Sequence, residues 1–258
     1  MINQGDLVQA LRAAGVEPGM TVFSHANIAF FGRVEGADSM DDLIRITLKS
    51  FAKALGPDGT LVLPVFTYSF GSDKQDKVFD LQNTLSTTSG MGNWLIMSGN
   101  GVRSADPMLS VVATGSKAEA LTADIDTVCF GSKSIWARLH SEDALICNLN
   151  FDSGSTYLHW VERGLGVPYR SDISMSGSII DGGQARTAQI VYSGRSLEDQ
   201  RAMPKFEAYH AACLAHGVST CIALGRGQIV AQQARAAKNF LESQMVENPY
   251  ILTARHSG

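Results

Sequence analysis

Hydrophobic and polar residues follow two different periods along this chain, and the two periods alternate. Apolar residues recur every three or four positions within residues 4–14 and 40–55, as in a helix with one buried face, and Gly56-Pro57-Asp58-Gly59 ends the second helix. Short apolar runs bounded by turn residues predict strands at residues 21–24, 60–66, 110–114, 144–149, 188–192 and 220–224, with 60–66 buried. Helices that alternate with strands are typical of an α/β fold.

The segments between these elements bear on domain organisation. No domain-sized linker interrupts the 258 residues, so we expect a single domain over residues 1–258. The loop-rich stretch from about 68 to 107 is too long for an ordinary connection, and we expect it to carry function or to form a small subdomain. Gly225-Arg226-Gly227 follows a strand and precedes a predicted helix at 229–241, where a plain strand-to-helix turn is favoured over an anion-binding turn.

Composition narrows the classes of partner. The polar N-terminal segment, and the lack of any apolar run near the roughly 18 residues that span a bilayer, predict a cytoplasmic protein that is neither exported nor inserted in a membrane. The four cysteines have no CxxC spacing and are expected to be buried free thiols of a reducing compartment. A net charge of -4 without basic clusters argues against a nucleic-acid partner, so a small-molecule substrate is expected.

Several common catalytic motifs are missing from the sequence. It contains no complete GxGxxG, GxxxxGK[ST], HExxH or GxSxG pattern. The six histidines are scattered, without cysteine or carboxylate companions at the offsets of a metal site, so no metal is expected. These observations favour metal-free acid–base or nucleophilic chemistry.

The segment from Thr156 to Glu162 is the strongest candidate for such chemistry. If it forms a helix, His159 and Glu162 share a face because they are three residues apart, and Thr156 lies one turn before the histidine. A carboxylate beside an imidazole fixes its tautomer and favours its protonated form, so His159 is a candidate general base. The alternative is an ordinary packed helix with a structural histidine.

A second candidate segment contains Asp106, followed by Pro107, which forces Asp106 into an extended conformation. The carboxylate would then orient an imidazole, accept a proton from an ammonium group, or only close an Asx turn around the proline. A third segment, Ser24-His25-Ala26-Asn27, follows a strand and leads into Phe30-Phe31-Gly32. Its backbone amides suit a phosphate or a pantetheine chain; the alternative is a plain strand-to-loop transition over the core with a structural His25.

These three segments, in this order, resemble the aminoglycoside 3-N-acetyltransferase family from about residue 21 to residue 170, and the C-terminal third resembles it more weakly. Further matching segments are residues 59–67, 90–92, 130–134 and 166–170. The resemblance implies an α/β antibiotic N-acetyltransferase-like fold with a mixed central sheet flanked by helices. This fold is unrelated to the common acetyltransferase fold, whose Q/RxxGxG/A loop is missing here. It also implies an enzyme that transfers an acetyl group from acetyl-CoA to the amine of a sugar.

One departure from the family pattern concerns the acceptor. Antibiotic-modifying members usually have a His-Pro pair in an RSxHPxxS motif, where this chain has Asp106-Pro107. In this respect it looks more like members associated with bacterial surface-polysaccharide synthesis, which implies a nucleotide-linked or lipid-linked amino sugar as acceptor. Aminoglycoside acetylation, which should require a strongly acidic acceptor surface, and a non-catalytic CoA-binding protein are the alternatives.

The resemblance suggests roles for particular residues in a direct transfer without an acyl-enzyme. His159 would be the general base, with Asp106 or Glu162 orienting it, and the thioester oxygen would receive hydrogen bonds from Thr67, Thr156 or amides near Ser110. The candidates for binding CoA are Ser24, His25, Ala26, Asn27, Arg103 and Ser104. The candidates for contacting the acceptor are Tyr68, Trp160 and Arg170. A homodimer is a generic expectation.

Overall fold

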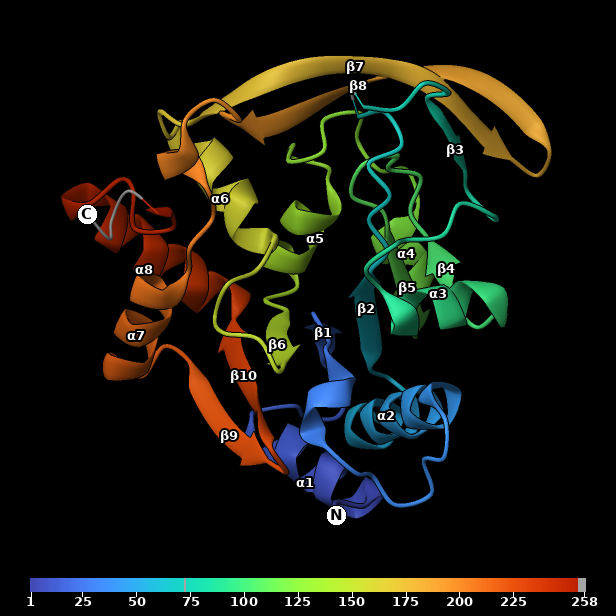
Figure 1. Ribbon diagram of the computed structural model, residues 1–258, viewed down its shortest axis with the longest axis vertical. Helices are drawn as coiled ribbons and strands as arrows, with labels where there is room; N and C mark the ends of the chain where they lie inside the picture. Colours follow the sequence, from blue (N-terminus) through green and yellow to red (C-terminus); the bar gives the residue numbers. More distant parts are fainter. Residues whose placement is uncertain (72, 255–258) are drawn as a thin grey trace.

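The computed structural model, which describes residues 1–71 and 73–254, has a seven-stranded mixed sheet at its centre (Figure 1). Its strand order is β4-β5-β2-β1-β6-β10-β9. The central strand β1 is parallel to β2 and β6, and the outer pairings are antiparallel. The strands are β1 (Thr21–Phe23), β2 (Thr60–Pro64), β4 (Val102–Arg103), β5 (Val111–Gly115), β6 (Leu145–Leu149), β9 (Thr220–Leu224) and β10 (Gly227–Gln233).

Helices cover both faces of this sheet. Successive strand residues point to opposite faces, so Val22 packs in one hydrophobic core and Phe23 in the other. The core with Val22 lies under α1 (Gln4–Ala13), α2 (Met40–Leu55) and α3 (Gly90–Met97). The core with Phe23 lies under α4 (Ala118–Thr122), α5 (Ile135–Ser141), α6 (Tyr157–Leu165), α7 (Glu207–Ala215) and α8 (Ala234–Glu247).

Local sequence explains where the helices begin and end. At the start of α2, Ser39 and Asp42 form a capping box, in which each side chain accepts a hydrogen bond from the other residue's backbone N–H. Gly56 ends α2 with φ +66°, and Gly166 ends α6 in the left-handed conformation that glycine adopts without strain. The chain therefore turns sharply after α6 and enters the next strand at Arg170.

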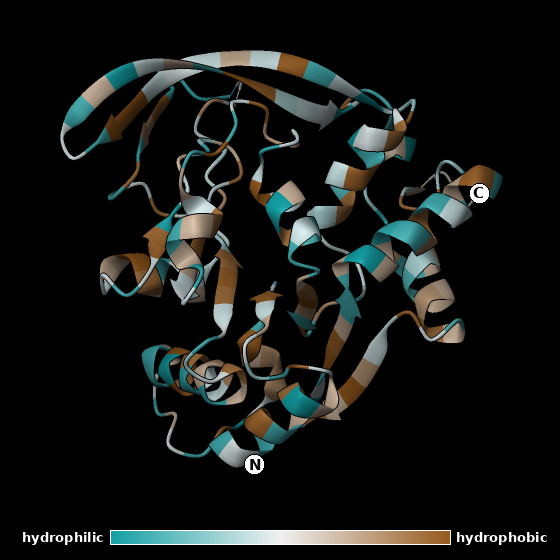
Figure 2. Cartoon of the chain, turned by 180° about the vertical axis from the view of Figure 1, so that it is seen from behind, coloured by the Kyte–Doolittle hydropathy of each residue, from teal (hydrophilic) through white to brown (hydrophobic). Residues whose placement is uncertain are grey.

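A second sheet of three strands lies across one end of the molecule, beyond α5 and α6 (Figure 1). It consists of β3 (Val78–Asp80) and a long hairpin of β7 (Arg170–Asp181) and β8 (Gln184–Arg195). Hydrophobic and hydrophilic residues alternate along the hairpin (Figure 2), and its two-residue loop, Gly182-Gly183, has positive φ at both positions. The register pairs Arg170 with Arg195, so both arginines lie at the base of the hairpin.

The α/β fold with a mixed sheet flanked by helices is confirmed, and three local predictions are wrong. Residues 229–241 do not form one helix, because 229–233 pair with β6 as part of β10 and α8 begins only at Ala234. The preceding Gly225-Arg226 is therefore a hairpin loop, with φ +59° at Gly225, and not a strand-to-helix turn. Among the four free cysteines Cys221 is exposed, because β9 is an edge strand.

Two other expectations concern segments rather than single elements. The stretch from 68 to 107 contains β3, α3 and β4; Met91 and Leu95 of α3 pack in the core under α2. The predicted strand at 188–192 is the middle of the longer β8. In the part of the chain that the structure describes, no helix is both long enough and apolar enough to cross a bilayer.

Candidate active site

A cavity of about 150 Å³ lies between the start of α6 and the base of the β7–β8 hairpin; we call it the His159 cavity. Thr156, the N-cap residue of α6, and His159 in its first turn both line the cavity, because positions three apart at a helix start face the same side. Its lining residues are Tyr68, Leu109, Phe130, Thr156, His159, Arg170, Tyr192, Arg195 and Pro204. The cavity therefore combines residues that are far apart in the sequence.

Glu162 holds His159 in this cavity. Oε2 of Glu162 lies 2.6 Å from Nδ1 of His159 and accepts a hydrogen bond from Nε of Arg170 at 2.7 Å, while its Oε1 accepts one from the Tyr169 hydroxyl at 2.6 Å. Glu162 is only 1% exposed, so these partners compensate for a charge that would be costly to bury alone. The His159–Glu162 pair predicted from the sequence is present.

The surroundings of His159 favour its neutral form. Burial lowers its pKa and, although the charge of Glu162 raises it, the Arg170 guanidinium lowers it again, so that the net shift is downward. For Glu162, burial raises the pKa, but the charge and hydrogen bond of His159 and the charge of Arg170 outweigh it and lower the pKa. With a proton on Nδ1 directed to Glu162, Nε2 is a free acceptor, and it makes no hydrogen bond with a described residue.

A second cavity, of about 130 Å³, lies around His25 at the end of β1; we call it the His25 cavity. Nε2 of His25 accepts a weak hydrogen bond from the Thr156 N–H at 3.4 Å, and the rings of Phe23, Phe66 and Phe151 surround the imidazole. Burial, and then the charge of His159, lower the pKa of His25 to about 4. The lining residues are Ser24, His25, Ala26, Leu63, Pro64, Phe66, Thr88, Ser89, Met91 and Phe151.

Thr156 lies between the two cavities, since it lines the first and contacts a residue that lines the second. Its side chain makes no capping hydrogen bond with the helix that it starts, and Oγ1 is 3.5 Å from Nε2 of His25. Among the described residues, the hydroxyl thus has only this long contact, at the boundary of the two cavities.

Asp106 does not contact His159. Its Oδ1 accepts hydrogen bonds from the backbone N–H groups of Met108 at 2.8 Å and Leu109 at 2.9 Å, which is the Asx turn considered above. The thiol of Cys129 approaches the same oxygen at 3.5 Å, and Oδ2 has no hydrogen-bond partner among the described residues. Because Asp106 is 3% exposed, burial raises its pKa, and the carboxylate that touches the imidazole is Glu162.

Several other predicted site residues line neither cavity. Arg103 is buried and donates to the carbonyl oxygens of Leu81, Thr84 and Val65. The hydroxyls near it are also engaged, Ser110 with the Val65 carbonyl and Thr67 with the Pro107 carbonyl.

The remaining predicted residues are divided between the cavities and the interior. Ser104 accepts a hydrogen bond from the Val111 N–H, and the N–H of Asn27 donates to Leu149. Trp160 packs on the rings of His140 and Tyr157. By contrast, Tyr68 and Arg170 line the His159 cavity, and Ser24, His25 and Ala26 line the His25 cavity.

Phe130, Tyr192 and Arg195 also line the His159 cavity and were not predicted from the sequence as site residues. Phe130 places its ring edge-on to His159, with the ring centroids 6.2 Å apart. Tyr192 and Arg195 come from β8, and only the hairpin register brings them next to α6. The available signal was Asp181-Gly182-Gly183-Gln184, a turn sequence between two alternating runs.

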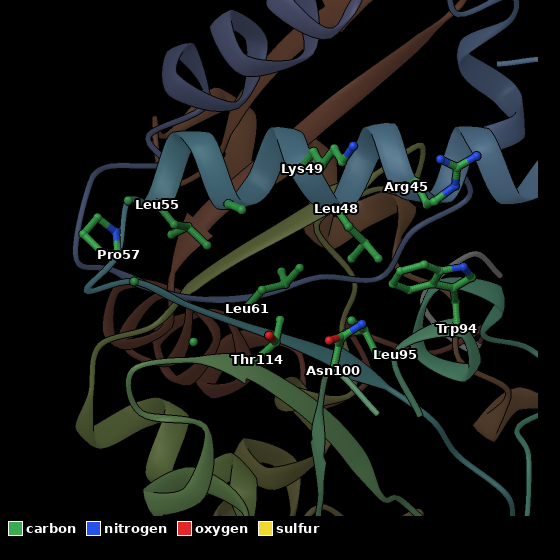
Figure 3. A pocket seen from close by; sticks show the side chains of 14 residues that line it. Arg45, Leu48, Lys49, Leu55, Pro57, Leu61, Trp94, Leu95, Asn100 and Thr114 are labelled. Atoms are coloured by element: carbon green, nitrogen blue, oxygen red, sulfur yellow. The ribbon is translucent and has the colours of Figure 1, made fainter. Parts of the chain in front are cut away.

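A further cavity, of about 300 Å³, lies elsewhere (Figure 3). It lies on the other face of the sheet, where Leu48 of α2 points toward Leu61 and Trp94, with Arg45 and Lys49 at its edge. Its lining contains no histidine, carboxylate or thiol that could act as a base or nucleophile. Within residues 1–71 and 73–254, no group of three His, Cys, Asp or Glu side chains is placed to hold a metal ion.

A neutral histidine held by a buried carboxylate in a cavity defines an acid–base site, and comparisons with known proteins identify its class. The fold is similar to aminoglycoside acetyltransferase AAC(3)-Xa, with a TM-score of 0.80 and 20% identity over 95% of this chain and 93% of that chain. It is also similar to AAC-IIIb solved with CoASH (TM-score 0.77, 21% identity, 95% and 96% covered) and to YokD from Bacillus subtilis (0.76, 18%, 95% and 99%).

The family model described as aminoglycoside 3-N-acetyltransferase matches residues 23–246. The chain therefore belongs to the aminoglycoside 3-N-acetyltransferase family, and it is an enzyme of the N-acyltransferase class. A comparison with curated protein sequences found no match.

Proposed function

We propose that this protein transfers an acetyl group from acetyl-CoA to the amine of an amino sugar, with His159 as general base. This proposal depends on the contact between His159 and Glu162. Nδ1 of His159 faces the Glu162 carboxylate, and Nε2 of His159 has no hydrogen-bond partner among the described residues. Membership of the family and the similarity to AAC-IIIb, solved with CoASH, support the reaction type and the donor.

The proposed place of the donor is the His25 cavity. Ser24 and Ala26 line it beside the end of β1, and Thr88 and Ser89 add polar groups at the start of α3. The aromatic rings of Phe66 and Phe151 suit an uncharged pantetheine chain, and the thioester would then reach Thr156 at the boundary with the His159 cavity.

The proposed reaction is a direct transfer in a ternary complex. The acceptor nitrogen attacks the thioester carbonyl, its proton passes to Nε2 of His159, the C–S bond breaks, and the thiolate leaves and takes up the proton as free CoA thiol. Glu162 stabilises the imidazolium that forms. No covalent intermediate is required, because a deprotonated amine is itself a strong nucleophile.

Thr156 is the candidate that we favour for stabilising the thioester oxygen. Its hydroxyl makes no capping bond and lies between the cavities, whereas the hydroxyls of Thr67 and Ser110 donate to backbone carbonyls. A hydrogen-bond donor near the developing negative charge lowers the barrier because it needs no reorganisation.

For the acceptor, an amino sugar linked to a nucleotide or lipid carrier in surface-polysaccharide synthesis is the main proposal, and an aminoglycoside antibiotic is the second candidate. The second is favoured by the family description and by similar structures, such as one titled AAC-VIa bound to sisomicin. In favour of the first are Asp106, in place of the histidine of antibiotic-modifying members, and an acceptor cavity without an exposed carboxylate.

The test is release of free CoA from acetyl-CoA in the presence of amino-sugar nucleotides or aminoglycosides. We expect turnover that the His159→Gln substitution lowers roughly 100- to 10,000-fold. A protein that binds acetyl-CoA but turns over no amine would instead be a CoA-binding protein, and one that does not bind acetyl-CoA would leave only the fold in common with the family.

A further inference from the structure

The charged groups around the His159 cavity are unbalanced. Its lining includes two guanidinium groups, Arg170 and Arg195, and no aspartate or glutamate. Because the pKa of His159 is lowered, this side chain is neutral at pH 7 and does not change the positive charge of the lining. The two arginines differ in what they contact.

Two of the three guanidinium nitrogens of Arg170 donate hydrogen bonds within the protein, and the third lies beside the imidazole of His159. Nε donates to Glu162 at 2.7 Å, Nη1 donates to the Ser193 carbonyl at 3.0 Å, and Nη2 lies 2.7 Å from Nδ1 of His159. The side chain is 5% exposed and its charge is paired with that of Glu162. Arg170 therefore fixes the catalytic pair and contributes little net charge to the cavity.

Arg195 has no such partner. Across residues 1–71 and 73–254, no hydrogen bond or ion pair involves its guanidinium, although the side chain is only partly exposed and lines the cavity. Its charge adds to the lowering of the pKa of His159, which burial dominates, and partly offsets the rise that burial causes in the pKa of Tyr192. Backbone pairing with Arg170 holds the residue at the base of the hairpin.

The carboxylates near the cavity do not neutralise Arg195. Glu162 is occupied by His159, Tyr169 and Arg170. Asp106 lies outside the lining, accepts two backbone hydrogen bonds with Oδ1, and has its pKa raised by burial. A partly buried cation without an internal counter-ion is a place where a ligand anion is stabilised.

We propose that Arg195 binds an oxyanion of the acceptor, so that the substrate is an amino sugar bearing a phosphate or a carboxylate. This inference rests on the proposed function and names its substrate class. A guanidinium binds phosphate and carboxylate oxygens through two parallel hydrogen bonds, and Tyr68 and Tyr192 provide hydroxyls in the same cavity. A polycationic aminoglycoside would bring like charge to Arg195 and is expected to be a poor acceptor.

The experiment compares three acceptors that are built on a 2-amino-2-deoxyglucose ring and differ in charge, together with one polycationic aminoglycoside. Glucosamine 1-phosphate supplies a phosphate and 2-amino-2-deoxyglucuronic acid supplies a carboxylate. Methyl glucosaminide is the amino sugar without an anionic group, and kanamycin is the polycation. The protein variants are Arg195→Gln, Arg195→Lys and, as control, Arg186→Gln. Arg186 lies on the same strand with an exposed side chain outside the cavity, so its change alters net charge equally.

Two measurements are made on each variant: the rate of CoA release, and equilibrium binding of each acceptor and of acetyl-CoA by calorimetry. We expect the wild type to bind at least one of the two anionic sugars about tenfold or more tightly than the neutral sugar, and Arg195→Gln to remove that preference. Arg195→Lys should retain part of it and Arg186→Gln all of it. The preferred anionic sugar identifies phosphate or carboxylate as the group bound.

Other results would overturn the inference. Equal or better binding of methyl glucosaminide or kanamycin by the wild type would exclude an anionic acceptor. Weaker acetyl-CoA binding by Arg195→Gln, with acceptor binding unchanged, would assign Arg195 to the phosphates of the donor. Failure of the proposed function is distinguishable, because anion binding that depends on Arg195 would then occur without any CoA release.

Discussion

The regions around His159 and His25 place two partly buried imidazoles in adjacent cavities, yet they give them different surroundings. His159 has a carboxylate at 2.6 Å from Nδ1 and a guanidinium beside it. His25 has aromatic rings around it and only the amide and hydroxyl of Thr156 within reach of Nε2. Both have lowered pKa values, that of His25 to about 4.

This difference shows that burial alone does not make a general base. A base must be neutral before the reaction and must hold the proton afterwards, so it needs a partner that stabilises its charged form. Glu162 supplies that partner for His159, whereas protonation of His25 would place a charge among apolar rings and next to His159. We therefore propose His159 for proton transfer and a packing or positioning role for His25.

The largest expected effect comes from removing each imidazole in turn. His159→Gln should lower kcat roughly 100- to 10,000-fold, while His25→Gln, whose amide oxygen can still accept from Thr156, should lower it less than tenfold. Measuring CoA release by both variants at saturating donor and acceptor tests this. Equal losses in the two variants would show that the histidines act together.

Replacing the carboxylate should have the next largest effect. Glu162→Gln should lower kcat about 10- to 1,000-fold, since the imidazolium loses its stabilising charge. In the wild type, Glu162 raises the pKa of His159, while burial and Arg170 lower it. Without the charge of Glu162 the pKa of His159 falls further, so the acidic limb of the kcat/KM profile should move to lower pH in the variant. In the wild type that limb should already lie below pH 6.5, the ordinary value for histidine.

A loss of kcat without this movement of the pH profile would contradict the assigned role and leave Glu162 only as a partner of Arg170. Arg170 would be buried without its counter-ion in the variant, so the fold must be checked by its unfolding temperature. Arg163→Gln is a suitable reference, because it breaks an exposed ion pair, with Asp172, near the same helix end.

The protonation of His25 should appear in stability rather than in catalysis. Its folded pKa of about 4 is below the unfolded value of 6.5, so the unfolded chain binds the proton more readily and stability falls as pH drops from 6.5 toward 4. Through this residue, lowering the pH from 7 to 5 should reduce the free energy of unfolding by about 1–2 kcal/mol. Urea unfolding of wild type and His25→Gln at both pH values measures it: the variant should lose that part of the pH dependence.

The two regions also differ in how far the sequence predicts them. Thr156, His159 and Glu162 lie within two turns of one helix, so their spacing alone predicts a shared face. Arg195 reaches the same cavity only because 12-residue strands pair around Gly182-Gly183, and a shift of one residue would turn it to the other face.

In two other segments the local sequence allowed more than one structure, and tertiary contacts determine which one forms. Asp106 had three possible roles, and the backbone N–H groups of the turn that follows it hold its carboxylate. Residues 229–233 satisfy a helical as well as an extended pattern, and pairing with β6 makes them a strand. Fold class and the contact between His159 and Glu162 were therefore predictable, while the lining from β8 and the last part of the sheet depended on strand register.

The smallest effects should separate the two cavities as sites for the two substrates. Tyr68 lines the His159 cavity with 43% of its surface exposed, and Phe151 lines the His25 cavity with 44% exposed, so both can be truncated with little cost to folding. Tyr68→Ala should raise KM for the acceptor about 3- to 10-fold and leave KM for acetyl-CoA unchanged, and Phe151→Ala should do the reverse.

Trp160→Phe is the control: Trp160 lines neither cavity, so this change should alter neither KM by more than about twofold. If Phe151→Ala instead weakened the acceptor, the assignment of donor and acceptor to the two cavities would have to be exchanged.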